Sequence, residues 1–113
     1  MLTSGDILDL ELGAPAGREA GFRRPVVVVT AQGILDESPN VVQVVPLTST
    51  TRSFGSEVVV EPDQTNHLEA VSSAQCQHIR VVSVDRAEAV RGTVGPTVLA
   101  QIRDVLGTLL DTS

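Results

Sequence analysis

The stretch GFRRPVVVVT, residues 21–30, places two arginines and a proline directly before four consecutive valines. A continuous run of β-branched residues is typical of a strand that is buried on both faces. The run therefore predicts a central strand over residues 25–30, with Arg23 and Arg24 at its entrance. Arginines at this place have two interpretations: they keep an apolar strand soluble, or a rigid strand aims a guanidinium at an anion.

Further strands are predicted on both sides of this one. GDILDLEL (5–12) alternates apolar and acidic residues, which is the pattern of a half-buried strand. VVQVVPLTST (41–50) reads as a second buried strand, which we expect to end at Pro46 because proline cannot donate to a ladder. A short strand at 57–61 and a longer one at 71–82 follow. The chain therefore reads as mainly β.

Loops and helical segments complete the pattern. Residues 13–21 and 31–40 are predicted loops, and 83–90 predicts one helical turn with Ser83 as its cap. After a brief return to strand, Pro96 stands at a first helical position. The apolar residues that follow have helical spacing: Val98, Leu99, Ile102, Val105, Leu106, Leu109 and Leu110. This order predicts a single domain over residues 1–113, a small bent antiparallel sheet or half-open barrel with a C-terminal α-helix.

The composition excludes several classes of protein. The chain has 113 residues, of which 42% are hydrophobic and 19% charged, as in an ordinary globular domain. It has no Trp or Tyr and only two Phe, so stacking platforms for nucleic-acid bases are almost absent. No apolar run approaches the ~20 residues of a membrane span. We expect a cytoplasmic protein with no membrane association.

The charge of the chain also limits what it binds and where. The net charge of −6 repels nucleic acid as a whole, so any binding of phosphate requires a local patch. All eight basic residues are arginines, the side chain best suited to bidentate recognition of phosphate.

Metal and triad chemistry are weakly supported. Cys76 and His78 stand two residues apart, with His67 in a preceding loop, whereas a zinc site requires three or four well-spaced ligands. A Ser-His-Asp triad is drawn only by combining Ser72 or Ser73 with His78 and Asp85, and no G-x-S-x-G motif is present. No phosphate-binding glycine loop occurs. We expect no metal and no cofactor.

Two strand-end clusters are the remaining candidates. GREAGFRRP (17–25) carries arginines before the valine strand, and VVPLTST (44–50) presents Thr48, Ser49 and Thr50 after a buried strand. Together they offer fixed cations and hydroxyl donors on rigid supports. Such a set suits a phosphodiester better than a neutral substrate.

These segments resemble one known family. GDILDLELG and GREAGFRRPVVVVT, then VVQVVPLTS, HIRVVSVDR and GTVGPTVLAQIRDVLGTLL, are similar in order and spacing to the MazF/PemK toxins. The resemblance covers nearly the whole chain. It implies an SH3-like barrel of the MazF/CcdB type, a homodimer, and a metal-independent, sequence-specific endoribonuclease. The implied substrate is single-stranded RNA (mRNA, with tRNA or rRNA as alternatives), cut to 2′,3′-cyclic phosphate and 5′-hydroxyl ends. The implied partner is a MazE-like antitoxin whose C-terminal tail occupies the RNA groove.

The resemblance assigns roles residue by residue. Arg24 and Thr48 match the catalytic pair of the family. The chain departs from the family at Arg18, Ala20, Gln77 and His78, which leaves the RNA sequence that is cut undefined. With these departures the expected RNA-binding residues are Arg18, Glu19, Arg23, Ser49, Arg52, Gln77 and His78. Glu19 and His78 are the candidate general bases.

Two alternatives stay open at this point. A gyrase poison similar to CcdB has the same barrel, but that group acts through an aromatic C-terminal tail and this chain ends TLLDTS. A catalytically inactive barrel that binds only an antitoxin or peptide is the second alternative, because the chain departs from the family at substrate-facing positions.

Overall fold

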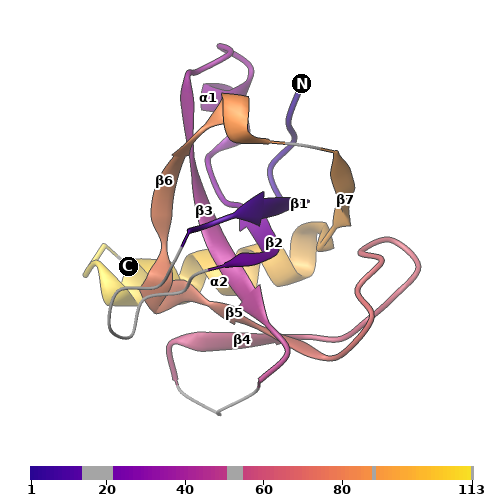
Figure 1. Ribbon diagram of the computed structural model, residues 1–113. Coiled ribbons are helices and arrows are strands. Elements are labelled where there is room, and N and C mark those ends of the chain that lie inside the picture. Colours follow the sequence, from indigo (N-terminus) through magenta and orange to yellow (C-terminus); the bar gives the residue numbers. More distant parts are fainter. Residues whose placement is uncertain (14–21, 51–54, 88, 113) are drawn as a thin grey trace.

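The computed structural model describes residues 1–13, 22–50, 55–87 and 89–112. Within them a single antiparallel sheet curls around on itself (Figure 1). Its strands and helices, in chain order, are β1 (Asp6–Glu11), β2 (Arg23–Val28), α1 (Gln32–Leu35), β3 (Val41–Thr48), β4 (Glu57–Val60), β5 (Ser72–Gln75), the 3-10 turn η1 (Cys76–His78), β6 (Arg80–Ser83), the 3-10 turn η2 (Val84–Arg86), β7 (Val90–Thr93) and α2 (Gly95–Leu109).

Strand β3 closes the curl because it pairs with three neighbours in succession. Its first half, from Val41 to Val44, pairs with β6, and the segment from Val44 to Pro46 pairs with β2. Leu47 and Thr48 then pair with β5. The strand order is β4-β5-β3-β2-β1-β7, with β6 attached to β3. The predicted mainly β, barrel-like class with a C-terminal helix is confirmed.

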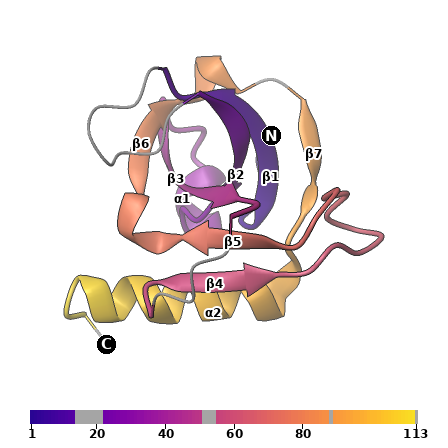
Figure 2. The same ribbon diagram turned by 60° about the horizontal axis from the view of Figure 1, so that its bottom comes forward.

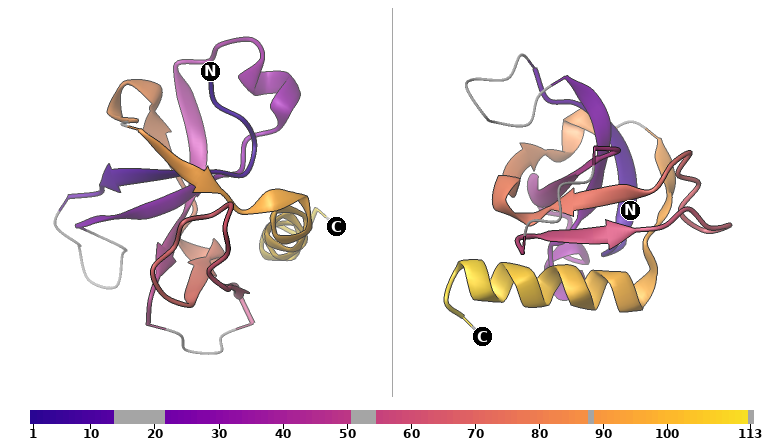
Figure 3. Two further views of the ribbon diagram at one scale, coloured as in Figure 1. Left: turned by 90° about the vertical axis from the view of Figure 1, so that its right-hand side faces the viewer. Right: turned by 90° about the horizontal axis from the view of Figure 1, so that it is seen from below.

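Two apolar clusters use the two faces of the sheet. On one face Ile7, Val27, Val45 and Leu47 pack with the buried face of α2, which lies beside β4 (Figure 2; Figure 3, right). On the other face the alternate residues form the second cluster: Leu8, Leu10, Val26, Val28, Val42, Val44 and Val82, with Leu35 covering them. The valine run is therefore buried on both faces, as its composition predicts.

Helix α2 confirms the expected C-terminal helix, with proline in its first turn. Leu99, Ile102 and Leu106 are buried against the sheet, whereas Leu109 and Leu110 at the end of the apolar stripe are exposed. The predicted turn at 83–90 is also present, as η2, and the Ser83 side chain accepts a hydrogen bond from the backbone of Asp85. No described helix is long and apolar enough to span a membrane.

The expected end of a strand at Pro46 is wrong, because β3 runs on to Thr48. The Val29 N–H donates to the Gln43 carbonyl, so Gln43, Val45 and Leu47 turn their backbone groups towards β2. By alternation, the nitrogen of Pro46 faces the opposite side, between the last pair with β6 at Val44 and the first pair with β5 at Leu47. At this corner no ladder donor is required, so the proline is tolerated.

Two further predictions are corrected. The long strand at 71–82 is two strands, because η1 interrupts it at Cys76–His78 and β5 and β6 then pair with different parts of β3. Cys76 and His78, the two residues weighed as metal ligands, therefore lie in a 3-10 turn rather than on a strand. The loop at 31–40 contains the short helix α1, whose Leu35 is buried in the core.

Candidate active site

A pocket of about 410 Å³ opens where β2 begins and β3 ends. Its size is within the usual range for small-ligand sites. Three segments and one side chain of β7 form its walls: Arg23, Arg24 and Pro25 from β2, Leu47, Thr48 and Ser49 from the end of β3, Leu68, Glu69, Ala70 and Ser72 from the segment before and into β5, and Arg91. Arginine and hydroxyl side chains thus line the pocket together with a few apolar ones.

The antiparallel pairing of β2 and β3 brings Arg24 and Thr48 together. Val26 is opposite Pro46 in this ladder. Continuing the same register by two residues sets Arg24 opposite Thr48, on one face of the sheet. Both side chains line the pocket and both are partly exposed. The two strand-end clusters of the sequence are therefore one site in space.

Gln75 of β5 fixes the position of Arg24. The Nη1 of Arg24 donates to the side-chain oxygen of Gln75 over 3.3 Å, and Gln75 is 5% exposed. On the same strand, Ser73 is opposite Thr48. The hydroxyl of Thr48 accepts a hydrogen bond from the Thr50 N–H, so its own proton can be donated into the pocket.

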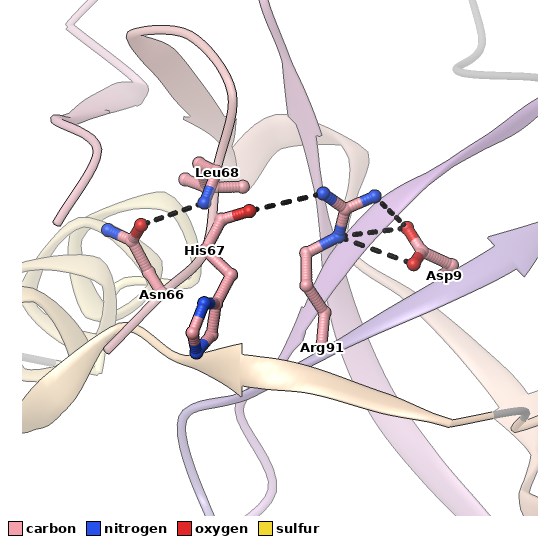
Figure 4. A network of polar contacts seen from close by, with 5 residues as sticks. All are labelled: Asp9, Asn66, His67, Leu68 and Arg91. Atoms are coloured by element: carbon pink, nitrogen blue, oxygen red, sulfur yellow. Dashed lines mark hydrogen bonds and ion pairs between the residues drawn. The ribbon is translucent and has the colours of Figure 1, made fainter. Parts of the chain in front are cut away.

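Arg91 lines the pocket from β7, and Figure 4 shows its polar contacts. Its Nη2 lies 2.9 Å from Oδ1 of Asp9, and its Nε lies 3.3 Å from both oxygens of that carboxylate. Its Nη1 donates to the His67 carbonyl at 3.3 Å. Asp9 is opposite Pro25 in the pairing of β1 and β2. Arg91 is therefore held from two sides, by Asp9 of β1 and by the His67 carbonyl.

The segment between β4 and β5, which forms one wall of the pocket, is held in place by several hydrogen bonds. Asn66 is 1% exposed, and its side chain accepts from the N–H groups of Asp63 and Leu68 and donates to the Glu61 carbonyl. Asp63 in turn accepts from the backbone of Asn66 and from Thr65. The hydrogen bond from the Asn66 N–H, followed by those from Thr65, lowers the pKa of the Asp63 carboxyl below its usual range.

Comparison with known proteins identifies the family. A model described as the PemK-like, MazF-like toxin of type II toxin–antitoxin systems matches residues 3–110. The chain belongs to this family.

Relatives of known structure or name agree with that assignment. The chain is 30% identical over 115 residues to the endoribonuclease MazF9 of Mycobacterium tuberculosis (strain ATCC 25618 / H37Rv), with 98% of each chain covered. MazF of Deinococcus radiodurans is 29% identical, with a TM-score of 0.77 over 96% of this chain and 94% of that one. A MazE–MazF structure from the same organism is 28% identical, with a TM-score of 0.71 over 97% and 96% of the two chains.

The structure of this MazF-family chain places some of the predicted RNA-binding residues at the pocket and others away from it. Arg23 and Ser49 line the pocket with Arg24 and Thr48. Gln77 and His78 belong to η1 and do not line it, and Gln77 instead bonds to Ser56 and Glu57. The remaining three, Arg18, Glu19 and Arg52, lie outside the described residues.

Sequence reasoning missed Gln75 and Arg91 of this site. Gln75 lies inside the expected strand 71–82 and Arg91 in the brief return to strand before Pro96, and neither carries a predicted role. The pairing of distant strands brings Gln75 to Arg24 and Arg91 to the pocket, and no local pattern encodes that pairing. The arginines themselves give one clue. A partly buried guanidinium requires a hydrogen-bond acceptor close by, which Gln75 provides for Arg24 and Asp9 for Arg91.

Cys76, one of the residues weighed as a metal ligand, lies in the core of the fold. Cys76 is buried, with its thiol directed to the carbonyls of Ala74 and Ile102. Burial raises the pKa of this thiol to about 11. In the part of the chain that the structure describes, no three His, Cys, Asp or Glu side chains are grouped as metal ligands would be.

Proposed function

We propose that this MazF-family chain is an endoribonuclease toxin that cleaves single-stranded RNA at the pocket of β2 and β3. One observation carries the proposal: a permanent cation, Arg24, and a hydroxyl donor, Thr48, line one pocket on neighbouring strands. A phosphodiester is the group that such a pair binds best. The family assignment and the 30% identity to an endoribonuclease support the same reaction.

RNA supplies its own nucleophile, so the protein needs no covalent intermediate. The 2′-hydroxyl loses its proton to a general base, its oxygen attacks the adjacent phosphorus, and the bond to the 5′-oxygen breaks. The departing 5′-oxygen takes a proton from water, so the products are a 2′,3′-cyclic phosphate and a 5′-hydroxyl. Charge accumulates on the non-bridging oxygens as the new bond forms. Arg24 stabilises that charge, and the Thr48 hydroxyl donates a hydrogen bond to the same oxygens. The rigid strands hold the phosphate in line with the attacking oxygen.

A general base must remove the proton of the 2′-hydroxyl. Glu19 is the candidate from the sequence, and Glu69 is the carboxylate that lines the described pocket. His78, the other sequence candidate, does not line that pocket. Glu19→Gln and Glu69→Gln distinguish the two carboxylates. Replacing the general base abolishes the fall in cleavage rate at low pH that protonation of that base causes, whereas replacing the other carboxylate leaves this fall in place.

The partners follow from the same site. MazE–MazF complexes are known for a relative that is 28% identical. We propose that this chain acts as a homodimer in the cytoplasm, where mRNA is translated, and that the C-terminal tail of a MazE-like antitoxin occupies the RNA groove. Acidic residues in such a tail would pair with Arg23 and Arg24, the cations that otherwise attract phosphate.

The experiment is a cleavage assay with purified protein, RNA and EDTA, followed by sequencing of the new 5′ ends. We expect cleavage with 5′-hydroxyl ends, and a loss of about 10²–10³ in rate for Arg24→Ala or Thr48→Ala. Arg103→Ala and Thr97→Ala, on α2, remove the same chemical groups outside the pocket and should cleave normally. Wild-type rates in both pocket variants would refute the mechanism. Absence of cleavage by folded wild-type protein would favour an inactive binding barrel or a gyrase poison.

A further inference from the structure

We propose that Arg91 determines base specificity, by donating two hydrogen bonds to the base that lies beside the scissile phosphate. The proposal rests on the RNA-cleaving function proposed above. Arg91 lines the same pocket as Arg24 and Thr48 but enters it from β7, where it is held by Asp9, the residue paired with Pro25. A nucleotide whose phosphate contacts Arg24 and whose base contacts Arg91 would fill this one pocket.

The charge of Arg91 suits a base better than a phosphate. Asp9 forms an ion pair with it at 2.9 Å, and both side chains are 27% exposed. The carboxylate compensates the positive charge locally, so the guanidinium acts mainly as a directional donor. Recognition of a neutral base edge depends on such directional hydrogen bonds, whereas binding of a phosphate depends mainly on net charge.

The donors that remain on Arg91 define the edge that it can read. A guanidinium carries five N–H donors and no acceptor. Among the described residues, Asp9 occupies Nε–H and one Nη2–H, and the His67 carbonyl occupies one Nη1–H. One N–H is left on each Nη atom. Two adjacent donors match two adjacent acceptors, and O6 and N7 of guanine are the commonest such pair.

The surroundings of Arg91 hold it ready for this contact. Asp9 and the His67 carbonyl fix the plane of the guanidinium before RNA binds, so little side-chain entropy is lost on binding. Pro25, which is partly exposed, lines the same pocket and offers an apolar surface on which the face of a base can rest. The wall that carries His67 is itself held by the buried Asn66 (Figure 4).

The test measures binding separately from cleavage. Short 2′-deoxy oligonucleotides lack the nucleophile, so they bind without being cut. Four of them, of deoxyuridine with G, A, C or U at one central position, are compared by fluorescence anisotropy. We expect wild-type protein to bind the G-containing probe roughly 5- to 100-fold more tightly than the others. In Arg91→Met and Arg91→Lys this preference should fall to about twofold or less.

Two variants are used because Arg91→Met leaves Asp9 without its cation and can unfold the protein. Arg91→Lys keeps the ion pair with Asp9 but lacks the planar fork, and thermal melting checks the fold of each. Arg103→Met removes an arginine of α2 outside the pocket and should keep the preference. An unchanged preference for G in folded Arg91→Lys would refute the proposal, as would the absence of any base preference in wild-type protein. If wild-type protein shows the Arg91-dependent preference but cuts no RNA, base recognition stands and the proposed nuclease function falls.

Discussion

Gln75 accepts a hydrogen bond from Arg24 through a neutral amide oxygen, at 3.3 Å, from a position that is 5% exposed. A carboxylate at this place would orient the guanidinium but would also cancel its charge. An amide orients it without doing so. Gln75 is therefore a positioning residue for the proposed reaction, since it acts through Arg24 rather than on the RNA.

Substitution Gln75→Leu keeps the size of the side chain and removes the acceptor. A hydrogen bond to a charged group contributes about 1.5–3 kcal/mol, so we expect cleavage to slow by roughly 10- to 100-fold. The loss should appear in kcat, with KM little changed. The double variant with Arg24→Ala gives the check: Gln75→Leu should have no further effect once Arg24 is absent. Additive losses in the double variant would show that Gln75 does not act through Arg24.

Cys76 gives a prediction about pH at the same scale. Burial raises the pKa of its thiol from 9.0 to about 11, so the folded state favours the protonated form. This contribution to stability is complete below pH 9 and is lost as the pH rises through about 11. At pH 8 the thiolate fraction is about 100-fold lower in the folded chain than in the unfolded one. A disulfide reagent should react about 100-fold more slowly with native protein than with protein in urea, and equal rates would contradict the buried position.

At the scale of elements, Gly92 of β7 allows the wall before β5 to lie against the sheet. A Cβ added at Gly92 would lie 2.3 Å from the carbonyl oxygen of Thr65 and 3.0 Å from the carbonyl carbon of Asn66. Both contacts are with backbone, and the Thr93 N–H donates to the same Thr65 carbonyl over 2.9 Å. The wall of the pocket is therefore docked on β7 at a point where only glycine fits.

Gly92→Ala should lower the free energy of unfolding in urea by about 1–3 kcal/mol, because the wall must move to accept the new methyl group. Gly33→Ala is the matched control, since a Cβ there meets nothing within 4 Å and the residue lies in α1. We expect the control to be neutral or stabilising by up to about 1 kcal/mol. Equal stability of wild type and Gly92→Ala would show that the loop adjusts without cost.

The elements that local pattern decides were predicted, and those that depend on tertiary pairing were not. The valine run and the helical spacing after Pro96 each point to one structure, and β2 and α2 follow them. Residues 71–82 have the composition of one strand, yet η1 divides them because β3 passes from β6 to β5 at this corner. A change of partner along a neighbouring strand leaves no trace in local sequence.

At the scale of the whole molecule, the site also contains residues that the sequence indicates and residues that only the fold brings in. Arg24 and Thr48 stand out in the sequence because Arg24 precedes one buried apolar run and Thr48 follows another. The ladder of β2 and β3 brings them together. Gln75 reaches Arg24, and Arg91 reaches the pocket, only through the curl of the sheet. The curl thus adds Gln75, which orients Arg24, and Arg91, the proposed base reader, to the pair that the sequence already indicates.

The net charge of the chain makes the proposed RNA binding a local property of the pocket. At −6 the protein as a whole repels RNA, so attraction depends on the few cations gathered at the pocket. Two or three phosphate contacts with single-stranded RNA would give a slope of about −1.4 to −2.1 in the logarithm of the binding constant against the logarithm of salt concentration. Arg24→Gln should reduce the magnitude of that slope by about 0.7, the contribution of one phosphate, whereas Arg103→Met on α2 should leave it unchanged. Titration of a 2′-deoxy oligonucleotide at several salt concentrations measures all three slopes. A flat response in wild-type protein, or equal slopes for wild type and Arg24→Gln, would place RNA binding outside the pocket.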